Sequence, residues 1–181
     1  MIELREYRAS DVEELVRLAD NRNVSRYLVD TFPYPYTRSD AEWWIQTGSK
    51  EGGAVTKVIE YQGRLVGSIG IRPQTGWRSH IAEIGCWVGE AYWGMGIASE
   101  ALERMSGLAF SQYAYRKLVA PVLGPNEASV RVLKKNSYFL EGVLKEEVFK
   151  DGEYFDIHQY AKIARGRTMG CSASPGAPAR T

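Results

Sequence analysis

The chain has 181 residues, of which 44% are hydrophobic and 25% are charged, and these values are typical of one folded domain with a sizeable apolar core. Lys and Arg number 23 against 22 Asp and Glu, so the formal net charge is +1, which gives no indication of a nucleic-acid partner or a polyanionic substrate. The two cysteines, Cys86 and Cys171, are too few for a disulfide framework, and neither a membrane-spanning apolar run nor a signal-peptide core is present, so we expect a cytoplasmic protein without a membrane partner.

The N-terminal part of the chain combines one strand with helices. Residues 2–7 alternate apolar and polar side chains as a strand does. Ser10 and Glu13 have the spacing of a capping box, in which the serine caps a helix and the glutamate bonds back to the cap. A second helix is expected from Thr37, with Asp40 in its first turn, where an acidic group favours the helix dipole.

The middle of the chain contains three predicted strands and one long helix. Residues 54–61 and 64–72 are strand-like and are joined at Gln62-Gly63, a typical hairpin turn. Residues 79–89 form the third strand. A glycine-rich bend follows, and then a long amphipathic helix with an apolar face made of Ile97, Ala98, Ala101, Leu102, Met105, Leu108 and Ala109.

One strand, one helix and a hairpin follow that long helix. Residues 117–123 are a short apolar strand, and Asn126 is a natural N-cap for a helix that ends near Lys135. The last two strands, 138–149 and 153–163, flank an Asp-Gly pair that favours a tight turn.

The composition changes at the C-terminal end of the chain. After Ala164 it turns to Gly, Ser, Ala, Pro and Arg without periodicity, so we expect one domain over residues 1–163 and a flexible tail over 164–181. Within the domain, the order is strand, helices, three strands, helix, strand, helix and two strands. This order predicts a mixed α/β or α+β sheet with helices on both faces.

The bend Gly94-Met95-Gly96 lies between a strand and the long helix, where unpaired backbone amides and the positive end of the helix dipole can bind a phosphate group. Three interpretations follow: a structural turn without a ligand, a dinucleotide fingerprint, or a cradle for the pyrophosphate of coenzyme A. The dinucleotide fingerprint requires a third glycine, where this chain has Ser99, and an acidic residue about 20 residues further on, which the chain lacks. The bend alone leaves the turn and the cradle open.

Longer segments around the bend carry a resemblance to a known family. Residues 82–102, followed by residues 126–138, resemble the two acetyl-CoA-binding motifs of the GNAT superfamily of N-acetyltransferases. Residues 141–156 resemble the closing hairpin of its Rim-type members, which acetylate the N-terminal amines of proteins. The match covers residues 2–163.

The resemblance implies a fold and a reaction. The fold is a GNAT-type mixed, mostly antiparallel sheet of about seven strands with helices on both faces. The reaction moves an acetyl group from acetyl-CoA, a cosubstrate, to a primary amine on a protein N-terminus or a small molecule, by direct attack in a ternary complex. No metal is expected, because two histidines and scattered acids form no ligand pattern. A homodimer is left open.

The resemblance also indicates how the chain holds acetyl-CoA. GNAT enzymes splay their central strands just before the bend, so the N–H group of Val88 is the expected donor to the thioester carbonyl. The cosubstrate pyrophosphate is expected on the backbone of residues 94–98, that is Gly94, Met95, Gly96, Ile97 and Ala98. Asn126 is expected to cap its helix and to bond the pantetheine arm.

Glu83 is the expected base that takes the proton of the amine. In an unbroken strand its side chain shares a face with Trp87, while the face with Ile84 and Cys86 is core-like, so Cys86 is expected in the core. A surface carboxylate or an ion pair is the alternative for Glu83, and Glu90 or water is a weaker candidate for the base.

Ser129 is expected to hydrogen-bond the leaving sulfur, since Rim-type enzymes carry a serine there. Its alternative is a bond to its own backbone. Many GNAT enzymes use a tyrosine seven residues after the motif asparagine, where this chain has Leu133, and carry Gln or Arg where it has Ala91. These departures keep open a second hypothesis, a non-catalytic acetyl-CoA-binding sensor or interaction module. The aromatic-rich residues 27–44 are expected to wall the acceptor cleft.

Overall fold

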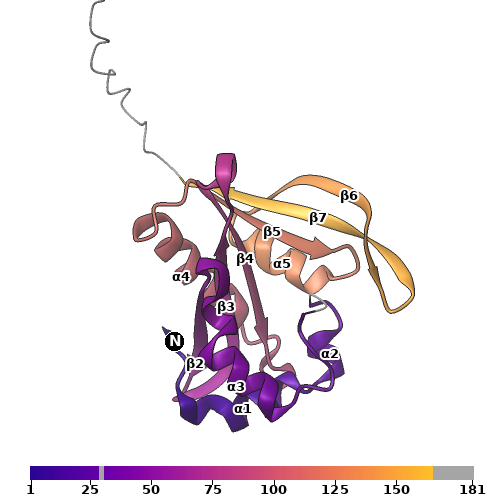
Figure 1. Cartoon of the computed structure of the whole chain (residues 1–181). Coiled ribbons are helices and arrows are strands. Elements are labelled where there is room, and N and C mark those ends of the chain that lie inside the picture. The colour runs from indigo at the N-terminus through magenta and orange to yellow at the C-terminus, as the bar shows by residue number, and fades with distance from the viewer. Residues whose placement is uncertain (29–30, 165–181) are drawn as a thin grey trace, which may run out of the picture.

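The computed structural model describes residues 1–28 and 31–164, so the predicted tail lies outside the described residues apart from Ala164. Seven strands form one sheet in the order β1-β2-β3-β4-β5-β7-β6 (Figure 1). Every neighbouring pair is antiparallel except β4 and β5, which are parallel. The strands are β1 (Ile2–Arg5), β2 (Val55–Tyr61), β3 (Arg64–Pro73), β4 (Ile81–Val88), β5 (Lys117–Leu123), β6 (Phe139–Lys150) and β7 (Glu153–Ile163).

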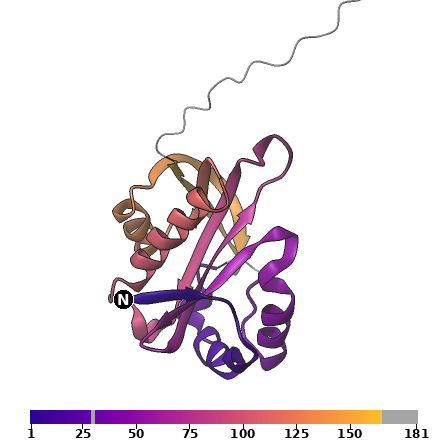
Figure 2. The ribbon, with the colours of Figure 1, turned by 90° about the vertical axis from the view of Figure 1, so that its left-hand side faces the viewer.

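Helices cover both faces of the sheet, as predicted, and Figure 2 shows the sheet between the two groups. The α-helices are α1 (Val12–Ala19), α2 (Arg22–Ser25), α3 (Arg38–Gln46), α4 (Ile97–Ser111) and α5 (Glu127–Lys135). The main core lies on the α4 and α5 face, where Met105 and Leu133 pack with Ile84 of β4. On the other face, Leu15 of α1 and Ala41 of α3 form a second cluster.

Several element boundaries agree with the local sequence signals that predicted them. Thr37 caps α3, because its hydroxyl accepts the N–H of Asp40 at 3.3 Å while its own N–H donates to the Asp40 carboxylate at 2.8 Å. The turn residues Gln62 and Gly63 have φ values of 51° and 74°. Two consecutive positive φ values are those of a tight hairpin turn, so the predicted hairpin is confirmed.

The prediction of a Ser10 capping box is wrong. A 3-10 turn, Ala9–Asp11, precedes α1, and the acid that bonds back is Asp11, whose carboxylate accepts the N–H of Arg8 at 2.7 Å. The same carboxylate receives two hydrogen bonds from the Arg5 guanidinium, at 2.8 and 2.9 Å. A partner on β1 therefore selects Asp11, and the spacing of Ser10 and Glu13 does not decide where the helix begins.

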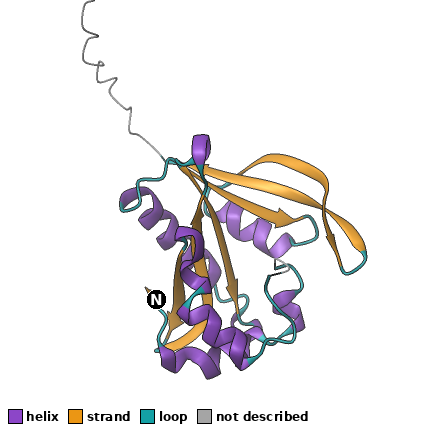
Figure 3. Ribbon diagram, in the orientation of Figure 1, coloured by secondary structure: helices purple, strands orange, loops and turns teal. Residues whose placement is uncertain are grey.

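The two parallel strands separate partway along their length. β4 and β5 pair only at three positions, from Ile81 opposite Lys117 to Glu83 opposite Val119. Beyond them β4 stays paired with β3 as far as Val88, while β5 stays paired with β7 over its whole length. The strands diverge, and Figure 3 shows the β6–β7 hairpin bending away with β5. The sheet therefore has a V-shaped opening at its centre.

Candidate active site

The backbone of β4 points unpaired N–H groups into the V-shaped opening. Ile81 accepts the N–H of Gln74, and the N–H of Gly89 donates to Val66, so the odd-numbered residues of β4 bond β3. Because alternate residues of a strand point their backbone groups to opposite sides, the N–H of Val88 points toward β5. The carbonyl of Val88 is taken by the Trp93 indole N–H at 2.7 Å. The Val88 N–H therefore faces the opening, as expected of a donor.

The glycine bend presents further unpaired amides at the start of α4. Gly94 and Gly96 have φ values of 77° and 78°, and Gly96 is the N-cap of α4 without a side-chain cap. Within the described residues, the N–H groups of residues 94–98 have no hydrogen-bond partner, and the first helical bond runs from Glu100 to Gly96 at 3.0 Å. A methyl group built on either glycine would meet no atom within 4 Å. The space beside both glycines is therefore open, and the unpaired amides of the bend fit a pyrophosphate.

Asn126 and Ser129 lie at the start of α5, just beyond the end of β5. The Asn126 side-chain oxygen accepts the N–H of Ser129 at 3.1 Å, so the predicted cap is present. The Ser129 hydroxyl has no hydrogen-bond partner within the described part of the chain. At the other end of α5, the Asn136 amide donates to the hydroxyl of Ser99 in the first turn of α4 at 3.0 Å. The C-terminal end of α5 thus lies against the first turn of α4, while Asn126 and Ser129 are at the other end of α5.

Glu83 lies on the opposite face of the sheet from α4. It is half-buried and forms no ion pair with any residue that the structure describes. Its side chain lines a cavity of about 420 Å³, in which Val119 and Pro121 of β5 supply apolar surface. The full lining is Gln74, Arg78, Glu83, Val119, Pro121, Leu144, Glu147, Ile157 and Gln159. Glu83 therefore faces a space that can hold a ligand, at the point where β4 and β5 separate.

Two other chemical groups near β4 are already occupied. Cys86 packs against the main core, as predicted, and burial raises the pKa of its thiol to about 11, so it stays protonated near neutral pH. The Glu90 carboxylate accepts the side-chain amides of Asn21 and Asn23 at 2.8 and 2.7 Å. It thereby holds the segment before and within α2, which makes it a poorer candidate for the base.

Several contacts join α2, near the N-terminal end of the domain, to the tip of the β6–β7 hairpin. Arg22 of α2 pairs with Asp151 at the tip of the β6–β7 hairpin, at 3.4 Å, and lies over the Tyr34 ring at 5.3 Å. Lys150 donates to the backbone carbonyls of Ser25 and Leu28. We call this contact the α2–hairpin clasp. No local pattern in the sequence indicated it, because its partners are more than a hundred residues apart.

Aromatic residues from the predicted segment 27–44 reach β4. The Phe32 ring lies 5.1 Å from that of Tyr36 and 5.7 Å from that of Trp87, between ring centroids. Trp87 is on the same strand face as Glu83, so these rings lie on the Glu83 face of the sheet. Together with Trp44, these rings pack in the cluster formed with α1 and α3.

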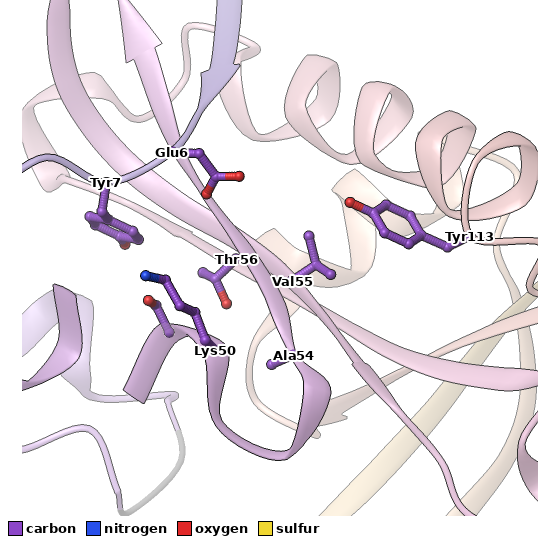
Figure 4. Close-up of a pocket in the computed structure, with 8 residues that line it drawn as sticks. Glu6, Tyr7, Lys50, Ala54, Val55, Thr56 and Tyr113 are labelled. Carbon is purple, nitrogen blue, oxygen red and sulfur yellow. The ribbon is translucent and has the colours of Figure 1, made fainter. Parts of the chain in front are cut away.

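A second cavity lies away from these residues. It has a volume of about 400 Å³ and lies at the edge of β2, beyond the end of β1, as Figure 4 shows. Tyr7, Lys50 and Tyr113 are among its lining residues, and the Tyr7 hydroxyl is engaged with that of Ser68 at 2.7 Å. None of the predicted site residues lines this cavity.

Among residues 1–28 and 31–164, no three His, Cys, Asp or Glu side chains gather as metal ligands would. None of the helices there is long and apolar enough to cross a membrane.

Comparison with known proteins agrees with this geometry. A family model described as an acetyltransferase (GNAT) domain matches residues 2–138. An uncharacterized N-acetyltransferase, p20 of Bacillus licheniformis, is 24% identical over 90% of the chain and 92% of its own length. The ribosomal-protein-serine acetyltransferase of Escherichia coli (strain K12) is 35% identical over 45% of the chain and 46% of its own length.

A solved structure gives the same picture for the fold. The structure of RimL, a ribosomal L7/L12 alpha-N-protein acetyltransferase in complex with coenzyme A, superposes with a TM-score of 0.79. Its sequence is 26% identical, and the match covers 90% of the chain and 93% of that protein. The predicted seven-stranded mixed sheet is confirmed.

Proposed function

The chain belongs to the GNAT acetyltransferase family, and from that premise we propose that this N-acetyltransferase moves the acetyl group of acetyl-CoA to the N-terminal amine of a polypeptide. The observation that carries the proposal is the arrangement around the V-shaped opening, with unpaired amides on the α4 side and the Glu83 cavity on the other face. Similarity to two enzymes named for acting on ribosomal proteins supports a polypeptide acceptor.

We assign the cosubstrate to the α4 side of the sheet. Its pyrophosphate binds the free amides of residues 94–98, where the helix dipole favours negative charge. The pantetheine arm then enters the opening between β4 and β5, beside Asn126. The N–H of Val88 donates to the thioester carbonyl and stabilises the negative charge that develops on its oxygen during attack.

The amine approaches from the opposite face, through the cavity that holds Glu83. Its nitrogen attacks the carbonyl carbon, the carbon–sulfur bond breaks, and the electron pair of that bond passes to the sulfur. Five residues of strand, about 16 Å, separate Glu83 from Val88, so Glu83 receives the proton of the nitrogen through intervening water. The free hydroxyl of Ser129 donates a hydrogen bond to the leaving thiolate. An N-terminal amine, with a pKa of about 8, needs less help from a base than a lysine with a pKa of about 10.4.

We also propose a homodimer and a cytoplasmic location. The edge strand β6 exposes apolar side chains, including Phe139, Leu140 and Val143, and such an edge favours a partner. The low cysteine content fits a reducing compartment. Light scattering tests the first of these proposals, and fractionation of the source cells tests the second.

The test is acetyl-CoA with a panel of amines, with release of free thiol as the readout and mass spectrometry to locate the acetyl group. The panel contains short peptides with a free N-terminus, N-terminally blocked peptides that contain lysine, amino acids and polyamines. We expect acetylation of free N-termini. If only small amines react, the polypeptide acceptor is wrong, and if acetyl-CoA binds but no amine reacts, the chain is a sensor.

A further inference from the structure

Trp77 is exposed to an extent that folding does not explain. It lies in the 3-10 turn Gly76–Arg78, at the tip of the hairpin that joins β3 to β4, and its side chain is 99% exposed. Trp43, which is also on the surface, is 51% exposed and contacts Trp44. A buried indole contributes a large apolar area to a core. The Trp77 indole makes no such contribution, so its apolar surface is available to a partner.

The hairpin tip is part of the rim of the acceptor cavity. Arg78, the residue after Trp77, lines the same cavity as Glu83. Across the cavity stands Leu144 of β6, which is 44% exposed. Its partner in the sheet, Ile157, also lines the cavity. Arg78 of the Trp77 turn and Leu144 of β6 therefore both line the space that a chain leaving the cavity crosses.

The size of the cavity limits what enters it. Its volume of about 420 Å³ falls within the range of about 300–1,000 Å³ that small-ligand pockets have. The cavity thus has room for the end of a polypeptide. The residues that follow the reacting amine must cross the rim.

We propose that Trp77 is a docking residue for the acceptor polypeptide and packs against an apolar side chain that follows its N-terminus. The inference rests on the proposed function, because it takes the Glu83 cavity as the acceptor site. The alternative partner for an exposed indole is a second copy of this chain. The acceptor is favoured because the tip is continuous with the cavity through Arg78, whereas the exposed apolar edge assigned to the homodimer is on β6.

The experiment uses a series of synthetic octapeptides that begin with serine and otherwise contain glycine and serine. Each peptide carries one leucine, and its position runs from the third residue to the last across the series. The dipeptide amide Ser-Gly is the short reference. For the wild-type enzyme we expect kcat/KM to rise about tenfold when the leucine reaches Trp77, mainly through a lower KM. The variant Trp77→Ala should lose this gain and acetylate the dipeptide amide at the wild-type rate. Tyr113→Ala, which removes an exposed ring beside the second cavity and away from the predicted site residues, is the matched control and should keep the gain.

The outcomes separate this inference from the proposed function. If no leucine position helps, or if the gain survives in Trp77→Ala, docking at Trp77 is overturned while acetyl transfer stands. If neither the dipeptide amide nor any octapeptide is acetylated, the polypeptide acceptor itself is wrong and the docking residue fails with it. A change in molar mass from two chains to one in Trp77→Ala would assign the tip to a contact between copies instead.

Discussion

At the scale of single residues, side chains alternate along β4 so that core residues lie on one face of the sheet and Glu83 lies on the other. The prediction that Ile84 and its even-numbered neighbours face the core is confirmed, since Ala82, Ile84 and Val88 are buried. Glu83 on the other face lines the cavity. Period-two alternation is a local property of a strand, so the sequence is sufficient to predict it.

Replacing Glu83 tests its role as the base. We expect Glu83→Gln to lower kcat at neutral pH by about tenfold to a hundredfold. This loss is at the low end of the rate enhancement that a general base supplies, because an N-terminal amine is already partly deprotonated. The deficit should shrink as the pH rises above the pKa of the amine, since the free amine then needs no base. The measurement is kcat against pH with a peptide acceptor.

Glu90→Gln is the control for that experiment. The Glu90 carboxylate accepts hydrogen bonds from the side chains of Asn21 and Asn23. Loss of this carboxylate should therefore change the acceptor KM more than kcat. A pH profile that is unchanged in Glu83→Gln, or a larger loss of kcat in Glu90→Gln, would remove Glu83 from its assigned role.

Ser129→Ala tests stabilisation of the leaving thiolate. The Asn126 cap uses the N–H of Ser129 and not its hydroxyl, so α5 should keep its stability. We expect kcat to fall about tenfold, the effect of losing one hydrogen bond to a charged group, with the KM for acetyl-CoA nearly unchanged. Ser111→Ala removes another helical hydroxyl, one that bonds the carbonyl of Gly107, and should leave kcat as it is. An equal effect of both changes would argue against a role for Ser129 in the chemistry.

At the scale of elements, the sequence predicts what depends on neighbours in the chain. The turns at Gln62-Gly63 and Asp151-Gly152 and the Asn126 cap of α5 are set by residues within four positions of one another. The four-residue helix α2 was not predicted. Asn21 caps it, but it is also held by Glu90, which lies 67 residues beyond Asn23. A contact over that separation leaves no signal in the neighbouring sequence.

Gly96→Ala tests the cradle at the start of α4. With φ of 78° and ψ of −1°, Gly96 has a left-handed backbone, which costs an alanine about 1–2 kcal/mol. A methyl group there meets no atom within 4 Å. The expected result is therefore a shifted backbone and an approximately tenfold higher Kd for coenzyme A, measured by calorimetry.

The matched control for the cradle is Gly107→Ala in the middle of the same helix. Space around Gly107 is also open, and alanine is the better helix former, so this variant should gain about 0.5–1 kcal/mol of stability and bind coenzyme A as the wild type does. A wild-type Kd for Gly96→Ala would show that the bend is a turn without a role in binding.

At the scale of the whole molecule, the central opening depends on pairing between strands that are distant in sequence. β4 remains paired with β3, and β5 remains paired with β7. The pairing of β4 with β5 therefore ends after Glu83 and Val119. Periodicity and spacing do not report such a register, and only the family resemblance implied that the strands splay. The same limit applies to the α2–hairpin clasp and to Glu147, which reaches the Glu83 cavity from β6.

The link between β1, β2 and the start of α1 gives a prediction about stability and pH. Asp11 is buried beside Arg5, which also bonds Glu60 of β2. Burial alone would raise the pKa of Asp11, but hydrogen bonds from Arg5 and from the backbone of Arg8 outweigh it, so the pKa is lowered. A lowered pKa means that the charged form stabilises the folded state, a contribution that is present above the unfolded pKa of about 4 and is lost as the pH falls through the folded value.

Asp11→Asn should therefore reduce the free energy of unfolding by about 2 kcal/mol near neutral pH, since it breaks charged hydrogen bonds and leaves Arg5 with only Glu60 and the Glu6 carbonyl. Urea unfolding at a series of pH values measures the difference, which should narrow below the unfolded pKa of about 4 as the wild-type carboxyl is protonated. Glu127→Gln, which breaks an exposed pair with Arg131, should cost about 0.5 kcal/mol or less. If the difference in free energy of unfolding between the wild type and Asp11→Asn stays constant down to low pH, the shape of the Asp11 side chain, and not its charge, holds β1 against the first helix.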